Sequence, residues 1–284
     1  MDATVIIMQV FTGLSLGMLY VLLALGLSII FGLLTVVNFA HGAMYMWGAY
    51  IGVAVVALTG NFWLALVVAP LVMGGYGLIV ERWLIRPLYG RDVNYPLLLT
   101  FGLLFIMVEI VRIFWGTSDQ PFSAPELLSM PVELFGIFYF PSYRLFVIGI
   151  TVVICIFLWI FLEKTSLGLI IRAGTRDPRM VRALGIDMNR IWWLVFAIGS
   201  ALAGLAGVLA SPIRSVYPEM GHFMLVECFV VVVVGGMGSL KGAILSGIIM
   251  GQAIGITTLF YPQFADIVIF LVMAVVLLIR PSGL

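Results

Sequence analysis

The residues that could do chemistry in this chain are a few polar side chains that interrupt long apolar runs. Glu109 and Arg112 are spaced i and i+3, so they can meet on one helix face and form an ion pair. Asn38, His41 and Tyr45 follow one another at spacings of three and four residues, which also places them on one helix face. Their uncharged hydrogen-bonding groups suit either the wall of a translocation pathway or a contact between helices.

Patterns for catalysis and metal binding are absent from the sequence. The two histidines, His41 and His222, lie far apart, and the two cysteines, Cys155 and Cys228, lie in apolar runs without metal-ligand spacing. No G-x-x-x-x-G-K-[ST] phosphate-binding loop is present, so any ATP hydrolysis must come from a partner. We therefore expect a chain that is not itself an enzyme, with no catalytic residue, no metal ligand and no bound cofactor.

The elements that must position these polar groups are membrane-spanning helices. Of the 284 residues, 63% are hydrophobic and only 10% are charged, whereas soluble proteins carry about 25% charged residues. This balance excludes a soluble enzyme, a disordered chain and a nucleic-acid-binding domain. Apolar runs of about 20 residues predict an all-α polytopic membrane protein. We expect eight to nine spans, near residues 5–32, 36–58, 62–82, 95–115, 143–162, 191–211, 222–240, 242–260 and 264–280.

Alternatives remain for several of these elements. One of the glycine-rich segments could form a re-entrant hairpin in place of a complete span. The Glu109–Arg112 pair is interpreted as a structural ion pair near the outer interface, with a role in the pore as the alternative. Glu227 lies early in the seventh expected span, and we expect it to pair with a charge on another helix.

The distribution of charge predicts the orientation of the chain. Most of the 14 lysines and arginines fall in the loops 82–94 and 163–190, and short basic loops face the cytoplasm. The loop 116–142 carries three acidic residues and neither Lys nor Arg, so it is expected to be periplasmic. Its apolar stretch around Gly136 could form a small hairpin. Nine spans then place the N-terminus outside and the C-terminus in the cytoplasm.

The loop 163–190 contains a short segment with both ends marked for a helix. Asp177 is a favourable N-cap, and Pro178 follows it at the first helical position. Gly185 stands where helices commonly end in a left-handed residue, so the expected helix spans Pro178–Leu184. A helix of this length must pack on something to be stable. Its apolar residues Met180, Val181 and Leu184, opposite Arg179 and Arg182, are suited to docking a second protein.

Several blocks of the sequence resemble one family of membrane proteins, the permeases of branched-chain amino-acid ABC importers. The resemblance is better to the first of their two homologous permease subunits than to the second. It rests on Asn38–Gly42 with Gly48–Tyr50, on Leu167–Ala173 with Arg182–Asp187, on Gly199–Gly207 and on Gly235–Gly242.

The resemblance implies a type II ABC-importer-like permease fold, with residues 1–284 as one permease domain in the bacterial inner membrane. It further implies a second permease subunit, two cytoplasmic ATPase subunits that bind ATP and Mg²⁺, and a periplasmic solute-binding protein. The loop 163–190 would then be the coupling loop, in which Asp177, Pro178, Arg179, Arg182, Leu184 and Gly185 contact the ATPase.

The substrate class stays open within this family, whose members import branched-chain or other hydrophobic amino acids, urea, short amides or aromatic acids. A stand-alone channel or secondary transporter is a further alternative, for which coupling carboxylates near the middle of the membrane would be expected. Asn38, His41 and Tyr45 are our candidates for the translocation pathway.

Overall fold

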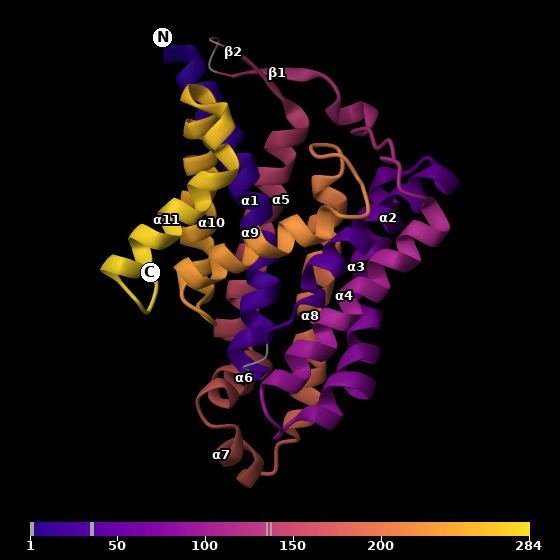
Figure 1. The fold of residues 1–284 in the computed structure, drawn as a ribbon, viewed down its shortest axis with the longest axis vertical. Helices are drawn as coiled ribbons and strands as arrows, with labels where there is room; N and C mark the ends of the chain where they lie inside the picture. The colour runs from indigo at the N-terminus through magenta and orange to yellow at the C-terminus, as the bar shows by residue number, and fades with distance from the viewer. Residues whose placement is uncertain (1–2, 35–36, 135, 137) are drawn as a thin grey trace.

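The computed structural model describes residues 3–34, 37–134, 136 and 138–284, and it is dominated by long apolar helices (Figure 1). Eight helices in this part of the chain are long and apolar enough to cross a membrane. Two of them are extended by shorter turns, α3 through a π-helical segment (Glu81–Ile85) and a 3₁₀ turn (Arg86–Leu88), and α11 by a preceding 3₁₀ turn (Pro262–Phe264). The eight are α1 (Ala3–Leu34), α2 (Ala40–Thr59), α3 (Phe62–Val80), α4 (Asn94–Trp115), α5 (Ser142–Lys164), α8 (Met188–Ala210), α10 (Leu240–Phe260) and α11 (Ala265–Ile279).

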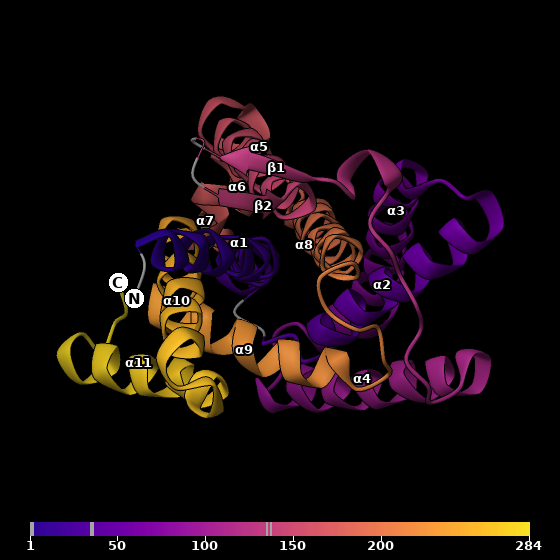
Figure 2. The same ribbon diagram turned by 90° about the horizontal axis from the view of Figure 1, so that it is seen from above.

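The seventh expected span, residues 222–240, is not a full-length helix. Its helix, α9 (Met220–Gly235), has 16 residues and is therefore about 24 Å long, shorter than the apolar core of a bilayer at about 30 Å. The run ends early because Gly236 and Gly238 adopt positive φ angles of 87° and 84°. Figures 1 and 2 both show α9 running across the neighbouring helices. The expectation of nine complete spans is therefore wrong at this position.

Helix α1 lies at the centre of the packing, between α5 on one side and α10 on the other (Figure 2). Small residues allow the backbones to approach closely, as is typical of helices in membranes. A Cβ atom added to Gly251 of α10 would lie 2.3 Å from the Cα of Gly17 in α1. A Cβ added to Gly48 of α2 would lie 2.2 Å from the carbonyl oxygen of Gly204 in α8. The abundant glycines thus set the distances between the helices.

The two ends of the helix bundle carry different structures. At the end that we call the hairpin end, β1 (Pro131–Leu134) and β2 (Phe138–Pro141) pair antiparallel, which confirms the hairpin predicted in the loop 116–142. Rings of Phe138 and Phe140 pack on Phe11 of α1. The opposite end, the α6–α7 end, carries α6 (Ser166–Arg176) and α7 (Pro178–Ala183). The sequence predicts the helix at α7, whereas the helix at α6 is not among the expected elements.

Candidate functional site

The caps of α7 have the geometry that the sequence predicts. The Asp177 carboxylate accepts hydrogen bonds from the backbone N–H groups of Arg179 and Met180, both at 3.0 Å. Pro178 occupies the first helical position, and Gly185 adopts a φ of 82°. The helix ends at Ala183, one residue before the expected end, and Leu184 forms its C-cap.

The apolar residues of α7 differ in burial. Val181 is buried, whereas Met180 and Leu184 are 60% and 73% exposed. An open groove of about 550 Å³ runs between α6 and α7, with Leu169 and Arg176 of α6 on its other wall. Val181 therefore holds α7 against the bundle, and Met180 and Leu184 are free to contact a second protein.

A line of stacked side chains connects α7 to the helices of the bundle. The guanidinium of Arg182 lies 4.7 Å from the ring centre of Trp192 in α8, and that ring lies 4.5 Å from the ring of Tyr89. The Tyr89 hydroxyl donates a 2.9 Å hydrogen bond to the buried carboxylate of Glu81, and burial beside this carboxylate raises the pKa of Tyr89. Arg86 completes the cluster with an ion pair of 2.7 Å to Glu81. Because Glu81 opens the π-helical segment, these contacts link α7 to the π-helical turn of the third span.

The ion pair predicted from the spacing of Glu109 and Arg112 is present, and a third charge joins it. Arg112 of α4 pairs with Glu109 and also, at 2.5 Å, with Glu219, the residue before α9. All three side chains are partly or largely exposed at the surface of the chain. The cluster therefore fastens α9 to α4 and presents charge outward.

A second charged cluster surrounds Glu227. Its carboxylate pairs at 3.2 Å with Arg214, which lies in the segment between α8 and α9 and not on another helix as expected. Arg214 also donates a 2.9 Å hydrogen bond to the Tyr20 hydroxyl of α1. Sequence reasoning missed Arg214, although a basic residue close to Pro212 in apolar surroundings was the available signal.

Asn38, His41 and Tyr45 are all completely buried inside the chain. Asn38 precedes α2, which begins at Ala40 rather than near residue 36, and its side-chain oxygen accepts from the Ala40 N–H at 3.1 Å. His41 Nε2 lies 3.1 Å from the carbonyl oxygen of Leu23 in α1, while the Tyr45 hydroxyl has no partner among the described residues. The structure gives these residues packing positions in this conformation, and their role in the pathway stays a prediction.

Comparison with known proteins places this architecture in a family. Residues 9–277 match the model of the branched-chain amino acid transport system permease component. The chain belongs to this permease family. It is 32% identical to the permease BraD of Pseudomonas aeruginosa and 30% identical to LivH of Escherichia coli, in each case over 97% of this chain and 94% of the relative. LivM of Escherichia coli is 27% identical over 83% of this chain and 60% of its own length. The resemblance to the first permease subunit is thus the more complete one.

A solved structure shares this fold. The structure described as PsaBC from Streptococcus pneumoniae in complex with Fab aligns with a TM-score of 0.52 and 16% identity, over 94% of this chain and 89% of the other. This confirms the expected fold class, an all-α polytopic membrane protein of the type II ABC-importer permease kind. Within the described part of this permease, no group of three or more His, Cys, Asp or Glu residues could hold a metal ion.

Proposed function

We propose that this permease forms, with a homologous second permease chain, the pathway of an ATP-driven importer for branched-chain or other hydrophobic amino acids. The names of BraD and LivH support this class of solute over urea, short amides and aromatic acids. Residues 1–284 act as one permease domain. Two separate ATPase subunits hydrolyse ATP with Mg²⁺, and a periplasmic binding protein delivers the solute.

The observation that carries this proposal is a group of charged residues beside membrane helices, part of which is exposed at the surface of the chain. Helices α4, α9 and α11 lie in a row along one side of the bundle in Figure 2, and we call this side the α4–α9–α11 face. Glu109, Arg112, Glu227 and Asp266 lie on these helices, and Arg214 and Glu219 lie in the segment between α8 and α9. Arg214 and Glu227 are mostly buried, whereas Glu109, Arg112 and Glu219 are partly or largely exposed. A charge exposed to lipid costs free energy, most of all near the centre of a bilayer. The second permease and a water-filled pathway would relieve this cost.

The ATPase subunits would dock on the α6–α7 end. Leu184 and Met180 project from α7 beside the groove shared with α6, and Arg179 and Arg176 are exposed around it. Apolar side chains ringed by arginine are typical of a protein contact. Asp177, Pro178 and Gly185 fix the shape of the helix, and Arg182 transmits its movement through Trp192 to α8.

The orientation in the bacterial inner membrane follows from the charges. The loop 163–190, with α6 and α7, carries a large share of the basic residues and would face the cytoplasm, whereas the hairpin end would face the periplasm. In this orientation the N-terminus is periplasmic. Helix α9, although shorter than a full span, leads from Glu219 beside Arg112 toward Gly238 beside Gly32 at the far end of α1, so that the C-terminus is cytoplasmic.

Transport by the complete complex in proteoliposomes tests the proposal. The permease would be reconstituted with its second permease, its ATPase subunits and its binding protein, and uptake of labelled leucine, valine, urea and a short amide would be measured. We expect uptake of leucine and valine that requires ATP on the side of the vesicle membrane where the ATPase subunits are bound. Uptake driven by an ion gradient without ATP would contradict the proposal and favour a secondary transporter.

A further inference from the structure

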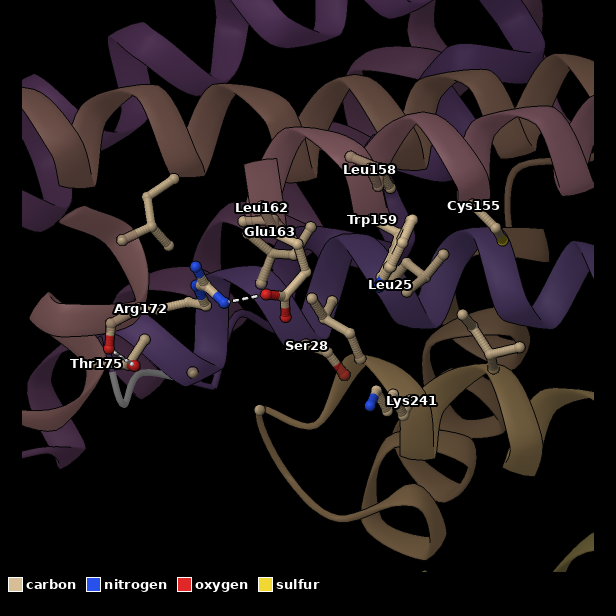
Figure 3. Close-up of a pocket in the computed structure, with 16 residues that line it drawn as sticks. Leu25, Ser28, Cys155, Leu158, Trp159, Leu162, Glu163, Arg172, Thr175 and Lys241 are labelled. Atoms are coloured by element: carbon tan, nitrogen blue, oxygen red, sulfur yellow. Dashed lines mark hydrogen bonds and ion pairs between the residues drawn. The ribbon is translucent and has the colours of Figure 1, made fainter. Parts of the chain in front are cut away.

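A largely apolar cavity of about 170 Å³ lies near the α6–α7 end, on the side of the molecule away from the α4–α9–α11 face (Figure 3). Its walls come from three helices that span the membrane, α1, α5 and α10. The apolar lining includes Leu25, Ile29, Leu158, Leu162, Leu240 and Ile244. A space of this shape can take a hydrocarbon chain and offers little to a fully polar ligand.

The end of the cavity nearest α6 is cationic. Arg172 of α6 and Lys241 of α10 both line it, together with Glu163 of α5. Arg172 pairs with Glu163, but no carboxylate of the described residues lies within ion-pair distance of Lys241. Two cations and one carboxylate leave a net positive charge, which is complementary to a single anionic group.

Ser28 adds an unsatisfied hydroxyl to the same end of the cavity. Its Oγ atom is buried, with the residue only 1% exposed, and it has no hydrogen-bond partner among the described residues. A buried polar atom without a partner is costly and uncommon in folded proteins. In Figure 3 the Ser28 hydroxyl and the Lys241 amine point to the same end of the cavity. The Nε atom of Arg172 is likewise buried without a partner.

The cavity adjoins an exposed, uncharged surface of α5. Helix α5, which forms one wall, turns Val153, Ile156 and Phe157 outward, and no charged residue lies among them. Trp159 lines the cavity and is itself about half exposed. This uncharged surface suits contact with lipid, unlike the charged surface assigned to the pathway.

We propose that this cavity binds an anionic phospholipid, with part of an acyl chain between α1, α5 and α10. The phosphate accepts hydrogen bonds from Lys241, from Arg172 and from the hydroxyl of Ser28. Since Arg172 lies on α6 and Lys241 on α10, the bound lipid joins the cytoplasmic helix pair to the membrane helices. This inference requires only that the helices span a bilayer and does not depend on the transported solute.

Lipid binding to the purified permease complex tests the proposal by native mass spectrometry. Phosphatidylglycerol should remain bound at concentrations at which phosphatidylcholine does not. Lys241→Gln should weaken phosphatidylglycerol binding about fivefold, since one basic residue near a lipid phosphate contributes roughly that factor. Lys241→Arg should restore binding. Lys164→Gln is the matched control, because Lys164 is exposed at the end of α5 and does not line the cavity.

Cys155 gives a second measurement, because it lines the cavity while Cys228 is buried elsewhere. In a Cys228→Ala complex held in nanodiscs, phosphatidylglycerol should slow alkylation of Cys155 relative to phosphatidylcholine. This readout uses an intact cavity and so distinguishes loss of lipid from misfolding of a variant. Equal binding of both lipids, or no effect of Lys241→Gln in a properly assembled complex, would overturn the proposal. Protection of Cys155 by free leucine in place of lipid would overturn it in favour of an amino-acid site.

Discussion

At the scale of single residues, the carboxylate of Asp177 determines whether α7 keeps its first turn. It accepts two backbone hydrogen bonds, and loss of such a cap costs about 0.5–2 kcal/mol. We expect Asp177→Ala to weaken ATPase stimulation by solute while the permease still inserts in the membrane. Asp177→Asn, which keeps a good capping group, should behave nearly like the wild type. The measurement is ATP hydrolysis by the reconstituted complex with and without loaded binding protein.

The burial of His41 leads to a different expectation. Since its ring lies against the carbonyl oxygen of Leu23 and close to Gly26, His41→Leu removes a buried hydrogen bond between α2 and α1 and changes the packing of the two helices. We expect the amount of assembled complex and the rate of transport to fall together. Gel filtration and leucine uptake on the same preparations measure the two quantities. Loss of transport with full assembly would instead support the pathway role predicted from the sequence.

The ion pairs also show which contacts of single residues can be predicted from the sequence and which cannot. The pairing of Glu109 with Arg112 follows from helix periodicity, because both residues lie on one helix. The contact of Arg112 with Glu219 joins positions 107 residues apart, and it depends on how α9 packs on α4. The pairing of Arg214 with Glu227 likewise depends on the path of the chain between α8 and α9. Local spacing predicts local partners and carries no information on such packing.

At the scale of elements, α7 presents Leu184 where an ATPase subunit would dock. An aspartate at this position places a charge in an apolar contact, and a buried charge without a partner is strongly destabilising. We expect Leu184→Asp to abolish copurification of the ATPase or to uncouple hydrolysis from transport, with the permease still inserted. Leu127→Asp is the matched control, because Leu127 is a similarly exposed leucine at the hairpin end. Normal ATPase binding together with normal transport in Leu184→Asp would move the docking site elsewhere.

Most elements of the fold could be predicted because apolar runs and helix caps are local signals. Eight of the expected spans correspond to long helices, and the caps of α7 were readable from Asp177, Pro178 and Gly185. Helix α9 could not be assigned correctly from hydropathy, since its run is apolar apart from His222 and Glu227 and is shortened by the backbone conformation at Gly236 and Gly238. Helix α6 was missed because its charged residues were interpreted as loop, although its side chains form an amphipathic helix.

At the scale of the whole molecule, the two ends of the bundle should lie on opposite sides of the membrane. Single cysteines at Ser123, near the hairpin end, and at Asp177, in the α6–α7 end, would be placed in a chain without Cys155 and Cys228. We expect a membrane-impermeant maleimide to label position 123 from the periplasm and position 177 only after the cells are opened. Labelling of both positions in intact cells would contradict the orientation.

If the exposed charges mark the pathway, the two permease chains contact each other through the α4–α9–α11 face. Long apolar side chains are also exposed on these helices, such as Ile113 of α4, next to Arg112, and Leu278 near the C-terminal end of α11. On the opposite side, Val153 of α5 is also exposed, but its surroundings are uniformly apolar and suit lipid. Exposure alone therefore does not distinguish the two sides, whereas charge does.

Photo-crosslinking separates the two sides directly. A benzophenone maleimide attached to a cysteine at position 113 or 278 should capture the second permease chain in the assembled complex, because an interface residue lies within reach of its partner. The same probe at position 153 should capture lipid and yield no product between the two permeases. The products are identified by the mass of the conjugated chains after ultraviolet illumination. Crosslinks from position 153 alone would place the permease interface on α5, and the charges of α4 and α9 would then need lipid or another subunit as their partner.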